Sequence, residues 1–367
     1  MKNIPRLSIV LPVYNGERYL SEAIESIINQ TFGDFELIIV NDCSSDETLD
    51  IANRFSDIDD RIIVTSNVEN SGLPVSLNNG FNISKGEYLT WTSDDNIYHT
   101  DALEKMVTYL DSNKECGLVF ADMNLIDENG EVIGHRIAEN YNIYSKNCVG
   151  ACFMYRSECK SVIGDYDDSK RLIEDYDYWL RIASFFKFGR IPEILYDYRY
   201  HNNSLTVKKL KLIGERLAEL RLEYIDKIAN SVDEKSYKEI VFEMVVCCEN
   251  KVLSSIDCSK VIDVDRVVNR KRIISGDRIW LFGAGALGRS ALEILSNKEI
   301  KGFIDNDTSK VGTEILGKPV LSLKQFEETK NKDSVVISTE LRYAYSILNQ
   351  LYSYGVDNAV LLYDVSY

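Results

Sequence analysis

The sequence contains no run of about 18 or more apolar residues, so it offers no segment long enough to cross a membrane as a helix. It also lacks internal repeats and low-complexity segments. No signal peptide is recognisable, because Met1-Lys2-Asn3-Ile4-Pro5 leads directly into a strand pattern. The eight cysteines show no CxxC spacing, which favours reduced thiols. Together these absences predict a cytoplasmic protein.

Positive charge is scarce as well. The chain carries 42 Lys and Arg residues against 58 Asp and Glu residues, a net charge of −16. A chain this acidic is not expected to bind nucleic acid or to dock electrostatically on anionic lipid. Lys208, Lys209 and Lys211 form one local basic patch, which fits the solvated start of a helix.

The length of 367 residues suits two domains and a linker, and a hydrophobic content of 45% is ample for their cores. Apolar strand patterns alternate with helical patterns up to residue 207, residues 208–275 read as helical, and a second alternation begins at residue 276. We therefore predict an α/β domain over 1–207, a helical linker over 208–275 and a small α/β domain over 276–367.

Four apolar runs in the first domain predict successive strands, separated by helical patterns. They lie over 7–14, 36–40 and 62–64 and in the segment that starts at Gly86. The residues that end three of these strands are Tyr14, Asp42 and the pair Asp94 and Asp95. Because the carboxyl ends of parallel strands line the ligand crevice of a doubly wound sheet, we expect these side chains at one edge. Adjacent carboxylates there suit a divalent cation held against a phosphorylated ligand.

Five segments carry a resemblance to a known family: SIVLPVYN, IIVNDCSSD, ENSGLPVSLNNG, GEYLTWTSDDN and IEDYDYWLR. In this order and spacing they resemble glycosyltransferase family 2, over roughly residues 5 to 205. The resemblance implies the GT-A fold, a mixed α/β sheet with flanking helices. It also implies an inverting transferase that takes a sugar from a nucleotide diphosphate sugar and uses a divalent cation, Mn²⁺ or Mg²⁺.

The same resemblance assigns contacts with the donor. It implies that the ring of Tyr14 stacks on the donor base and that Asp42 reads this base, usually uracil. Core packing of Tyr14 and turn chemistry of Asp42 are the alternatives. Asp95 is implied as the metal ligand. The other residues that the motifs assign to the donor nucleotide are Pro12, Asn15, Asn70, Asn78 and Asp94.

Two positions depart from the commonest family pattern. Thr92 stands where many members have a further Asp, so the metal site rests on Asp95, with Asp94 as a supporting group or a ribose contact. Leu77 stands where an Arg often precedes Asn78, which removes a candidate phosphate contact.

Asp175 matches the catalytic base of the family. A carboxylate that removes the acceptor proton, with no second carboxylate as nucleophile, gives a single displacement and inversion at the anomeric carbon. A cation at Asp95 would neutralise charge on the leaving diphosphate. Acids at a helix start are also favoured by the helix dipole, which is the alternative for Glu174 and Asp175. The residues implied in the acceptor region are Gly150, Glu174 and Trp179.

His201 is one of three histidines and stands where family members often carry YRxH. The resemblance implies a contact with the metal or the diphosphate, and a structural role is the alternative. Gly150 likewise fits either the segment beneath the acceptor or the close-packed start of a strand. Asp127-Glu128-Asn129-Gly130-Glu131 predicts a hairpin in the acceptor half of the fold.

The last domain opens with a strand pattern, the loop GAGALG and a helix, and its second strand ends in an acid about 20 residues after the first glycine. These residues are Gly283, Gly285, Gly288 and Asp305. With its GFIDND and GKPV segments, this part resembles the small Rossmann-like domains attached to sugar acyltransferases and some methyltransferases. A second nucleotide ligand and a purely structural scaffold are equally compatible with it.

The resemblance to glycosyltransferase family 2 therefore implies a hexosyltransferase that uses a UDP-sugar and acts on a saccharide or lipid-linked saccharide in surface polysaccharide or glycoconjugate synthesis. A lipid-linked acceptor would bring the protein to the inner face of the membrane, where the Lys208 patch could make a peripheral contact. A homo-oligomer is compatible with the sequence. Two other functions stay open: a non-catalytic nucleotide-sugar binding protein, and an NAD-dependent oxidoreductase that uses the GxGxxG loop.

Overall fold

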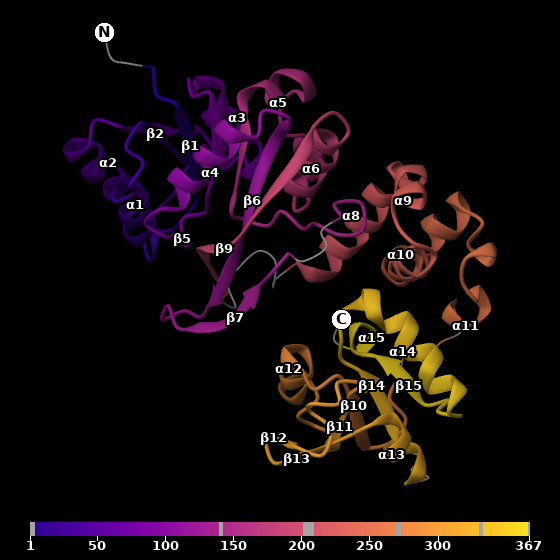
Figure 1. Cartoon of the computed structure of the whole chain (residues 1–367). Coiled ribbons are helices and arrows are strands. Elements are labelled where there is room, and N and C mark those ends of the chain that lie inside the picture. The colour runs from indigo at the N-terminus through magenta and orange to yellow at the C-terminus, as the bar shows by residue number, and fades with distance from the viewer. Residues whose placement is uncertain are drawn as a thin grey trace. The chain divides into compact units, whose positions relative to one another are not determined.

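The computed structural model describes residues 4–138, 142–200, 209–268, 270, 273–329 and 333–365. The chain divides into two compact units, Met1–Ile213 and Gly214–Tyr367, each with its own sheet (Figure 1). His201 and Lys208 lie outside the described residues. Within the described part of the chain, no helix combines the length and the apolar character needed to cross a bilayer.

The first unit is built on a mixed sheet with the order β3-β2-β1-β4-β8-β6-β9-β5, and β7 pairs with β6. Its strands are β1 (Leu7–Val13), β2 (Phe35–Asn41), β3 (Ile62–Ser66), β4 (Tyr88–Trp91), β5 (Ile97–Tyr98), β6 (Cys116–Ile126), β7 (Val132–Arg136), β8 (Phe153–Arg156) and β9 (Lys187–Arg199). Strands β1 to β4 pair in parallel, whereas β8 runs antiparallel to β4 and β6. The carboxyl ends of β1, β2 and β4 therefore share one edge, as predicted. The predicted hairpin is confirmed as the β6–β7 connection.

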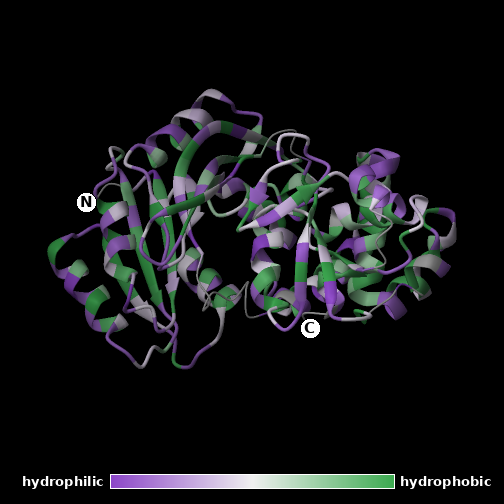
Figure 2. Ribbon diagram, turned by 90° about the horizontal axis from the view of Figure 1, so that it is seen from below, coloured by the Kyte–Doolittle hydropathy of each residue, from purple (hydrophilic) through white to green (hydrophobic). Residues whose placement is uncertain are grey.

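Helices cover both faces of this sheet. They are α1 (Leu20–Ile28), α2 (Thr48–Ile58), α3 (Leu73–Ile83), α4 (Ala102–Ser112), α5 (Ser157–Ile163) and α6 (Glu174–Ala183), with a 3₁₀ turn over Asp168–Lys170. Leu7, Ile9 and Leu11 of β1 share a buried cluster with α1, α2 and α4. On the other face, a Cβ added to Gly80 of α3 would meet Val10 at 2.5 Å. The strands of this unit are mostly green in Figure 2, as expected for a sheet covered on both sides.

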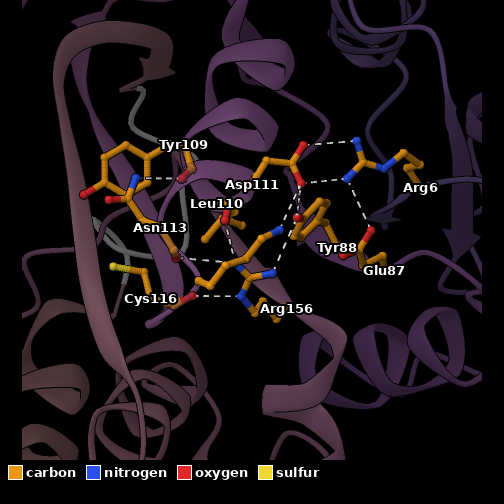
Figure 3. Close-up of polar contacts among 10 residues, drawn as sticks. Arg6, Glu87, Tyr88, Tyr109, Leu110, Asp111, Asn113, Cys116 and Arg156 are labelled. Carbon is orange, nitrogen blue, oxygen red and sulfur yellow. Dashed lines mark hydrogen bonds and ion pairs between the residues drawn. The ribbon is translucent and has the colours of Figure 1, made fainter.

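A polar network secures the edge of the sheet where β1 and β4 begin (Figure 3). Arg6 pairs with Asp111 near the end of α4 at 2.9 Å, and the Tyr88 hydroxyl donates to the same carboxylate at 2.7 Å. The hydrogen bond from Arg6 is the main cause that lowers the pKa of Asp111 to about 2, and burial raises the pKa of Tyr88 to about 12. This edge is therefore fixed by interactions separate from those at the carboxyl edge.

Arg156, the last residue of β8, belongs to the same network. Its guanidinium donates to the carbonyl oxygens of Cys116 (2.9 Å), Leu110 and Asn113 (3.4 Å). Leu110 lies in the last turn of α4, and Asn113 follows this helix, so the cation adds a second donor to carbonyl groups at the helix end that already accept the N–H groups of Asn113 and Cys116. Arg156 thus joins the end of α4 to the start of β6.

The second unit carries a sheet with the order β12-β13-β11-β10-β14-β15 among its described residues. Its strands are β10 (Arg278–Phe282), β11 (Glu299–Ile304), β12 (Glu314–Ile315), β13 (Lys318–Leu321), β14 (Ser334–Ile337) and β15 (Ala359–Leu361). All neighbours pair in parallel except β12 with β13. The helices of the sheet region are α12 (Ala286–Ile294), α13 (Leu323–Glu328), α14 (Leu341–Ser353) and α15 (Leu362–Val365).

The described part of residues 208–275 is helical, as the periodicity predicts. It forms α8 (Leu210–Glu223), α9 (Ile225–Ser231), α10 (Glu234–Ser255) and α11 (Val264–Val268), with a 3₁₀ turn over Cys258–Lys260. Arg221 of α8 pairs with Glu243 of α10 at 2.7 Å. Cys248 has a φ of −147°, which kinks α10 at this residue.

Replacing Arg156 by Met keeps much of the apolar stem but removes the guanidinium. We expect the free energy of unfolding of the first unit to fall by about 2 kcal/mol, because three partly buried carbonyl oxygens each lose a charged donor. In a Trp280→Phe background, fluorescence of Trp91 and Trp179 reports this unit alone during urea denaturation, since the chain has three tryptophans. The exposed Arg54 on α2 provides the control. Arg54→Met should change the free energy of unfolding of the first unit by less than about 0.5 kcal/mol. Equal losses in both variants would contradict the capping role.

Candidate active site

Asp42 follows β2 and is 4% exposed. Its Oδ1 accepts hydrogen bonds from Asn67 Nδ2 (2.7 Å) and Ser71 N (2.8 Å), and its Oδ2 accepts one from Gly72 N (2.8 Å). These donors come from the segment between β3 and α3, so their contacts are not those of a local turn. Asp42 fixes this segment against the end of β2.

The segment between β3 and α3 is braced from two further directions. Asn67 accepts a hydrogen bond from Asn79 of α3 at 2.8 Å. Arg171, just before α6, donates to Ser71 O at 2.8 Å, and its guanidinium lies against Gly72. The sequence did not single out Asn67 or Arg171, because the partners of Arg171 lie about a hundred positions away and no local pattern marks such a pairing.

The loop after β1 is tied to the loop after β2. Asn15 adopts a left-handed conformation with a φ of 52°; its N–H donates to Ser44 Oγ (3.0 Å) and its Oδ1 accepts from Ser45 N (2.9 Å). Tyr14 precedes it and is 51% exposed, so it is not the core residue that was the alternative. The two ties hold the backbone from which this ring projects.

Asp94 and Asp95 form the turn after β4. The carboxylate of Asp94 lies directly over Gly16, where a Cβ would come within 1.9 Å of Asp94 Oδ2. Burial is the main cause that raises the pKa of Asp94 to about 7, and the negative charge of Asp95 is the second cause. Two carboxylates held together in this way suit a divalent cation, because its charge would offset their repulsion.

The backbone of this turn is held from inside the protein by Arg199, the last residue of β9, which is 2% exposed. Its Nε donates to Asp95 O at 2.9 Å, and its own N–H donates to Asn96 Oδ1 at 2.8 Å. The same guanidinium pairs with Glu22 of α1 at 2.6 Å and donates to Asp127 O in the β6–β7 turn at 3.2 Å. One buried cation therefore joins four segments that are distant in sequence.

The hydroxyl of Thr92 is hydrogen-bonded in the core to the hydroxyl of the buried Tyr196. Among the residues that the structure describes, no three His, Cys, Asp or Glu side chains converge on a point where a metal ion could bind. Asp94 and Asp95 fit the other common arrangement, in which one or two carboxylates share a cation with the phosphates of a ligand. Oxygen ligands of this kind suit Mg²⁺ or Mn²⁺.

Asp175 is the second residue of α6. Its Oδ2 accepts a hydrogen bond from Asn147 Nδ2 (2.9 Å) and its Oδ1 accepts one from Tyr176 N (2.7 Å). Burial raises the pKa of Asp175, although these two donors and the charge of Arg136 act in the opposite direction. An oriented carboxylate with a raised pKa has the properties of a general base.

The other residues predicted for the acceptor region differ in exposure. Gly150 has a φ of 71°, and a Cβ there would meet Met123 Cε at 2.5 Å. Glu174 is 6% exposed. Trp179 of α6 is fully buried, and its ring lies edge-to-face against Phe153 of β8, with 4.5 Å between the ring centroids. It therefore offers no surface to a ligand in this structure.

The remaining residues predicted to contact the donor differ in their exposure and hydrogen bonding. Pro12 is buried within β1, whereas Asn70 is exposed. Asn78 uses both ends of its amide on the backbone of Tyr166, with distances of 2.8 and 2.9 Å, so it joins α3 to the segment before α6. Leu77 is fully buried in the core, consistent with its apolar character.

The glycine loop of the second unit lies between β10 and α12. Gly285 precedes α12, and Gly288 approaches Gly283 so closely that a Cβ would come within 1.8 Å of the Gly283 carbonyl oxygen. Asp305, directly after β11, accepts hydrogen bonds from Ala284 N and Asp307 N, both at 2.8 Å. The acid predicted to follow the second strand is therefore bonded to the glycine loop itself.

Sequence comparisons relate this arrangement to known proteins. The model of a family described as Glycosyl transferase family 2 matches residues 8–161. An uncharacterized glycosyltransferase of Methanocaldococcus jannaschii is 34% identical over 218 residues, which covers 56% of this chain and 75% of the relative. This chain belongs to glycosyltransferase family 2. The putative teichuronic acid biosynthesis glycosyltransferase TuaG of Bacillus subtilis is 29% identical to this glycosyltransferase, over 56% of the chain and 84% of TuaG.

The fold of this glycosyltransferase is also that of solved structures. Residues 1–349 of TarS from S. aureus superpose with a TM-score of 0.52 at 15% identity, covering 72% of this chain and 87% of that one. The first unit is therefore a GT-A fold, as the motifs predicted. At this level of identity the similarity concerns the fold alone.

Gly16 of this glycosyltransferase offers a test of the turn after β4. A methyl group at Gly16 would displace the Asp94 carboxylate, so we expect Gly16→Ala to weaken binding of UDP in the presence of Mn²⁺ about tenfold, measured by calorimetry. Gly33→Ala is the matched control, because the nearest atom to its added Cβ is 4.0 Å away. Equal affinities in the two variants would show that the position of Asp94 is unimportant for binding.

Proposed function

We propose that this glycosyltransferase moves a sugar from a UDP-sugar to the hydroxyl group of a saccharide, with inversion at the anomeric carbon. The observation that carries the proposal is the Asp175 carboxylate. It is oriented by donors on both oxygens, and burial raises its pKa, which makes it a stronger base. Family membership supplies the reaction class in which such a base is needed.

In the proposed reaction, the oxygen of the acceptor hydroxyl attacks the anomeric carbon of the sugar. Asp175 accepts the proton of that hydroxyl during the attack. The bond between that carbon and the diphosphate breaks, and the nucleoside diphosphate leaves from the opposite face. A single displacement of this kind inverts the configuration, so an α-linked donor gives a β-linked product. The carboxylate must be ionised to act, so turnover should rise with pH through the pKa of Asp175.

Asp95 is proposed to hold a divalent cation, Mn²⁺ or Mg²⁺, with Asp94 as the neighbouring carboxylate. When bound, the cation supplies Lewis-acid stabilisation of the charge on the diphosphate. Support comes from the raised pKa of Asp94, which burial causes first and the neighbouring Asp95 carboxylate second. Arg199 contributes by fixing the Asp95 carbonyl, so the metal-binding side chain extends from a rigid turn.

The proposed donor contacts are the exposed ring of Tyr14, stacked on the base, and the carboxylate of Asp42. Support for a uridine nucleotide comes from TarS, whose structure in complex with UDP-GlcNAc superposes with a TM-score of 0.50. TuaG, named for teichuronic acid biosynthesis, supports a setting in surface polysaccharide or glycoconjugate synthesis. We propose a saccharide or lipid-linked acceptor and a location in the cytoplasm, at the inner face of the membrane.

The transfer reaction is proposed to reside in residues 1–207, with 208–275 as a helical connection and 276–367 as a Rossmann-like domain. An NAD-dependent reaction in that last domain is the weaker candidate. The acid that would bind a ribose, Asp305, is occupied by Ala284 N and Asp307 N, and a dinucleotide would have to compete with these bonds. A second nucleotide bound to the same loop without hydride transfer remains part of the proposal.

Asp95→Asn tests the metal site. We expect UDP binding in Mn²⁺ to weaken at least about tenfold, to the level that wild type shows in EDTA, because a neutral amide is a poor ligand for a divalent cation. Calorimetric titration measures both values. Asp50→Asn, at an exposed acid on α2, should bind as wild type does. Metal-independent binding that persists in Asp95→Asn would indicate the GAGALG loop, and unchanged metal-dependent binding would refute the assignment of Asp95.

Asp175→Asn tests the base. We expect the rate of UDP release from the bound UDP-sugar to fall about 10²–10⁴-fold, because the amide cannot accept the acceptor proton. The affinity for the donor should stay close to that of wild type, as measured by calorimetry. Equal turnover in both proteins would reject the base, and donor binding without turnover even in wild type would favour a non-catalytic nucleotide-sugar binding protein.

A further inference from the structure

Segment 142–150 lies between β7 and β8 and is attached to α6 at two points. The hydroxyl of Tyr176 donates to Ile143 O at 2.8 Å, and Asn147 Nδ2 donates to Asp175 Oδ2 at 2.9 Å. Tyr176 is 2% exposed, so the first attachment is internal. The second reaches the carboxylate proposed as the base. The sequence did not single out Asn147.

The amide of Asn147 is held in one orientation. Its Oδ1 faces the N–H of Gly150 at 3.5 Å, which turns the NH₂ group towards Asp175. The guanidinium of Arg136 on β7 donates to the backbone carbonyl of Asn147. Gly150 has a φ of 71°, a left-handed conformation that favours glycine, so this return of the chain suits glycine.

We propose that Asn147 is a positioning residue for the general base: it fixes the Asp175 carboxylate in one orientation and ties it to segment 142–150. The inference rests on the proposed role of Asp175 as the base. With Oδ1 bonded to Tyr176 N and Oδ2 to Asn147, each oxygen keeps a second lone pair, and the plane of the carboxylate is set by two donors on different segments. A base that is fixed in this way needs no reorientation when the acceptor arrives.

The same hydrogen bond stabilises the ionised form of Asp175 and so lowers its pKa against the effect of burial. Arg136 on β7 acts in the same direction. Tyr166, in the segment between α5 and α6, is a titratable neighbour whose pKa the charge of Asp175 helps to raise, and Glu174 and Asp177 share the first turn of α6. Loss of the Asn147 donor should therefore raise the pKa of the base.

Asn147→Asp is the sharpest variant, because it keeps the shape and the acceptor for Gly150 N but replaces the donor with a second carboxylate. The probe is UDP-GlcNAc with Mn²⁺, with other UDP-sugars tested in turn until one releases UDP. We expect the acidic limb of kcat/KM against pH to move up by about one unit or more, and kcat/KM at neutral pH to fall about tenfold. Donor affinity should not change. Asn147→Ala should shift the limb in the same direction.

Asn124→Asp is the matched control. Asn124 on β6 donates to Asp197 on β9 at 2.7 Å, so the substitution also places two carboxylates together, but away from Asp175. It should leave the acidic limb where wild type has it. Melting temperatures establish whether each variant is folded. If Asn147→Asp does not fold, Asn147→Ala replaces it as the test variant.

An unmoved acidic limb in the folded Asn147 variants, with only KM changed, would show that Asn147 merely shapes the loop and would overturn the inference. A loss of donor binding would do the same. These outcomes are separable from failure of the proposed function. If Asp175→Asn retains wild-type turnover, the base is wrong. If Asp175→Asn is inactive while Asn147→Asp keeps the wild-type profile, only the positioning role is wrong.

Discussion

The geometry of the candidate site depends on the interactions of one buried group, the guanidinium of Arg199. It contacts the backbone of the turn after β4, a carboxylate of α1 and the β6–β7 turn, and it stacks 4.4 Å from the ring centroid of Tyr19. A buried cation needs such partners, because an unpaired one would carry a large desolvation cost. The requirement works in both directions. The segments that satisfy Arg199 are thereby fixed relative to one another, and the turn that carries Asp94 and Asp95 is one of them.

The site also concentrates negative charge, and the structure deals with each carboxylate differently. Asp42 is surrounded by N–H donors, so its charge is compensated within the protein. Asp175 has two donors and retains a raised pKa because of burial. Asp94 lies over Gly16 beside a second acid, and burial and the charge of that acid raise its pKa. These three surroundings match the three proposed roles: Asp42 in recognition of the donor base, Asp175 in proton transfer and Asp94 beside the metal ligand.

The sequence predicted the strands β1, β2 and β4 because a parallel strand buried on both faces leaves an apolar run, and it predicted Asp42, Asp94 and Asp95 because they follow such runs. The sequence did not indicate residues whose role depends on a contact between distant segments, such as Asn147, Asn67 and Arg199. No local sequence pattern marks them, because the role of an amide or a guanidinium depends on the partner that the fold brings to it. Trp179, by contrast, was read as part of the acceptor region, whereas its ring is enclosed by other aromatic rings.

The hydrogen bonds of Asp42 also limit what else it can bind. A carboxylate offers about four lone-pair positions, and Asn67, Ser71 and Gly72 take three of them, two on Oδ1 and one on Oδ2. One position on Oδ2 remains. Under the proposed role, a base with a single imide N–H, such as uracil, fills it and leaves no donor over. Guanine presents a ring N–H and an amino group side by side, so one of them would lose its hydration without a partner here. Selectivity among nucleotides would then arise from how few acceptors Asp42 has left.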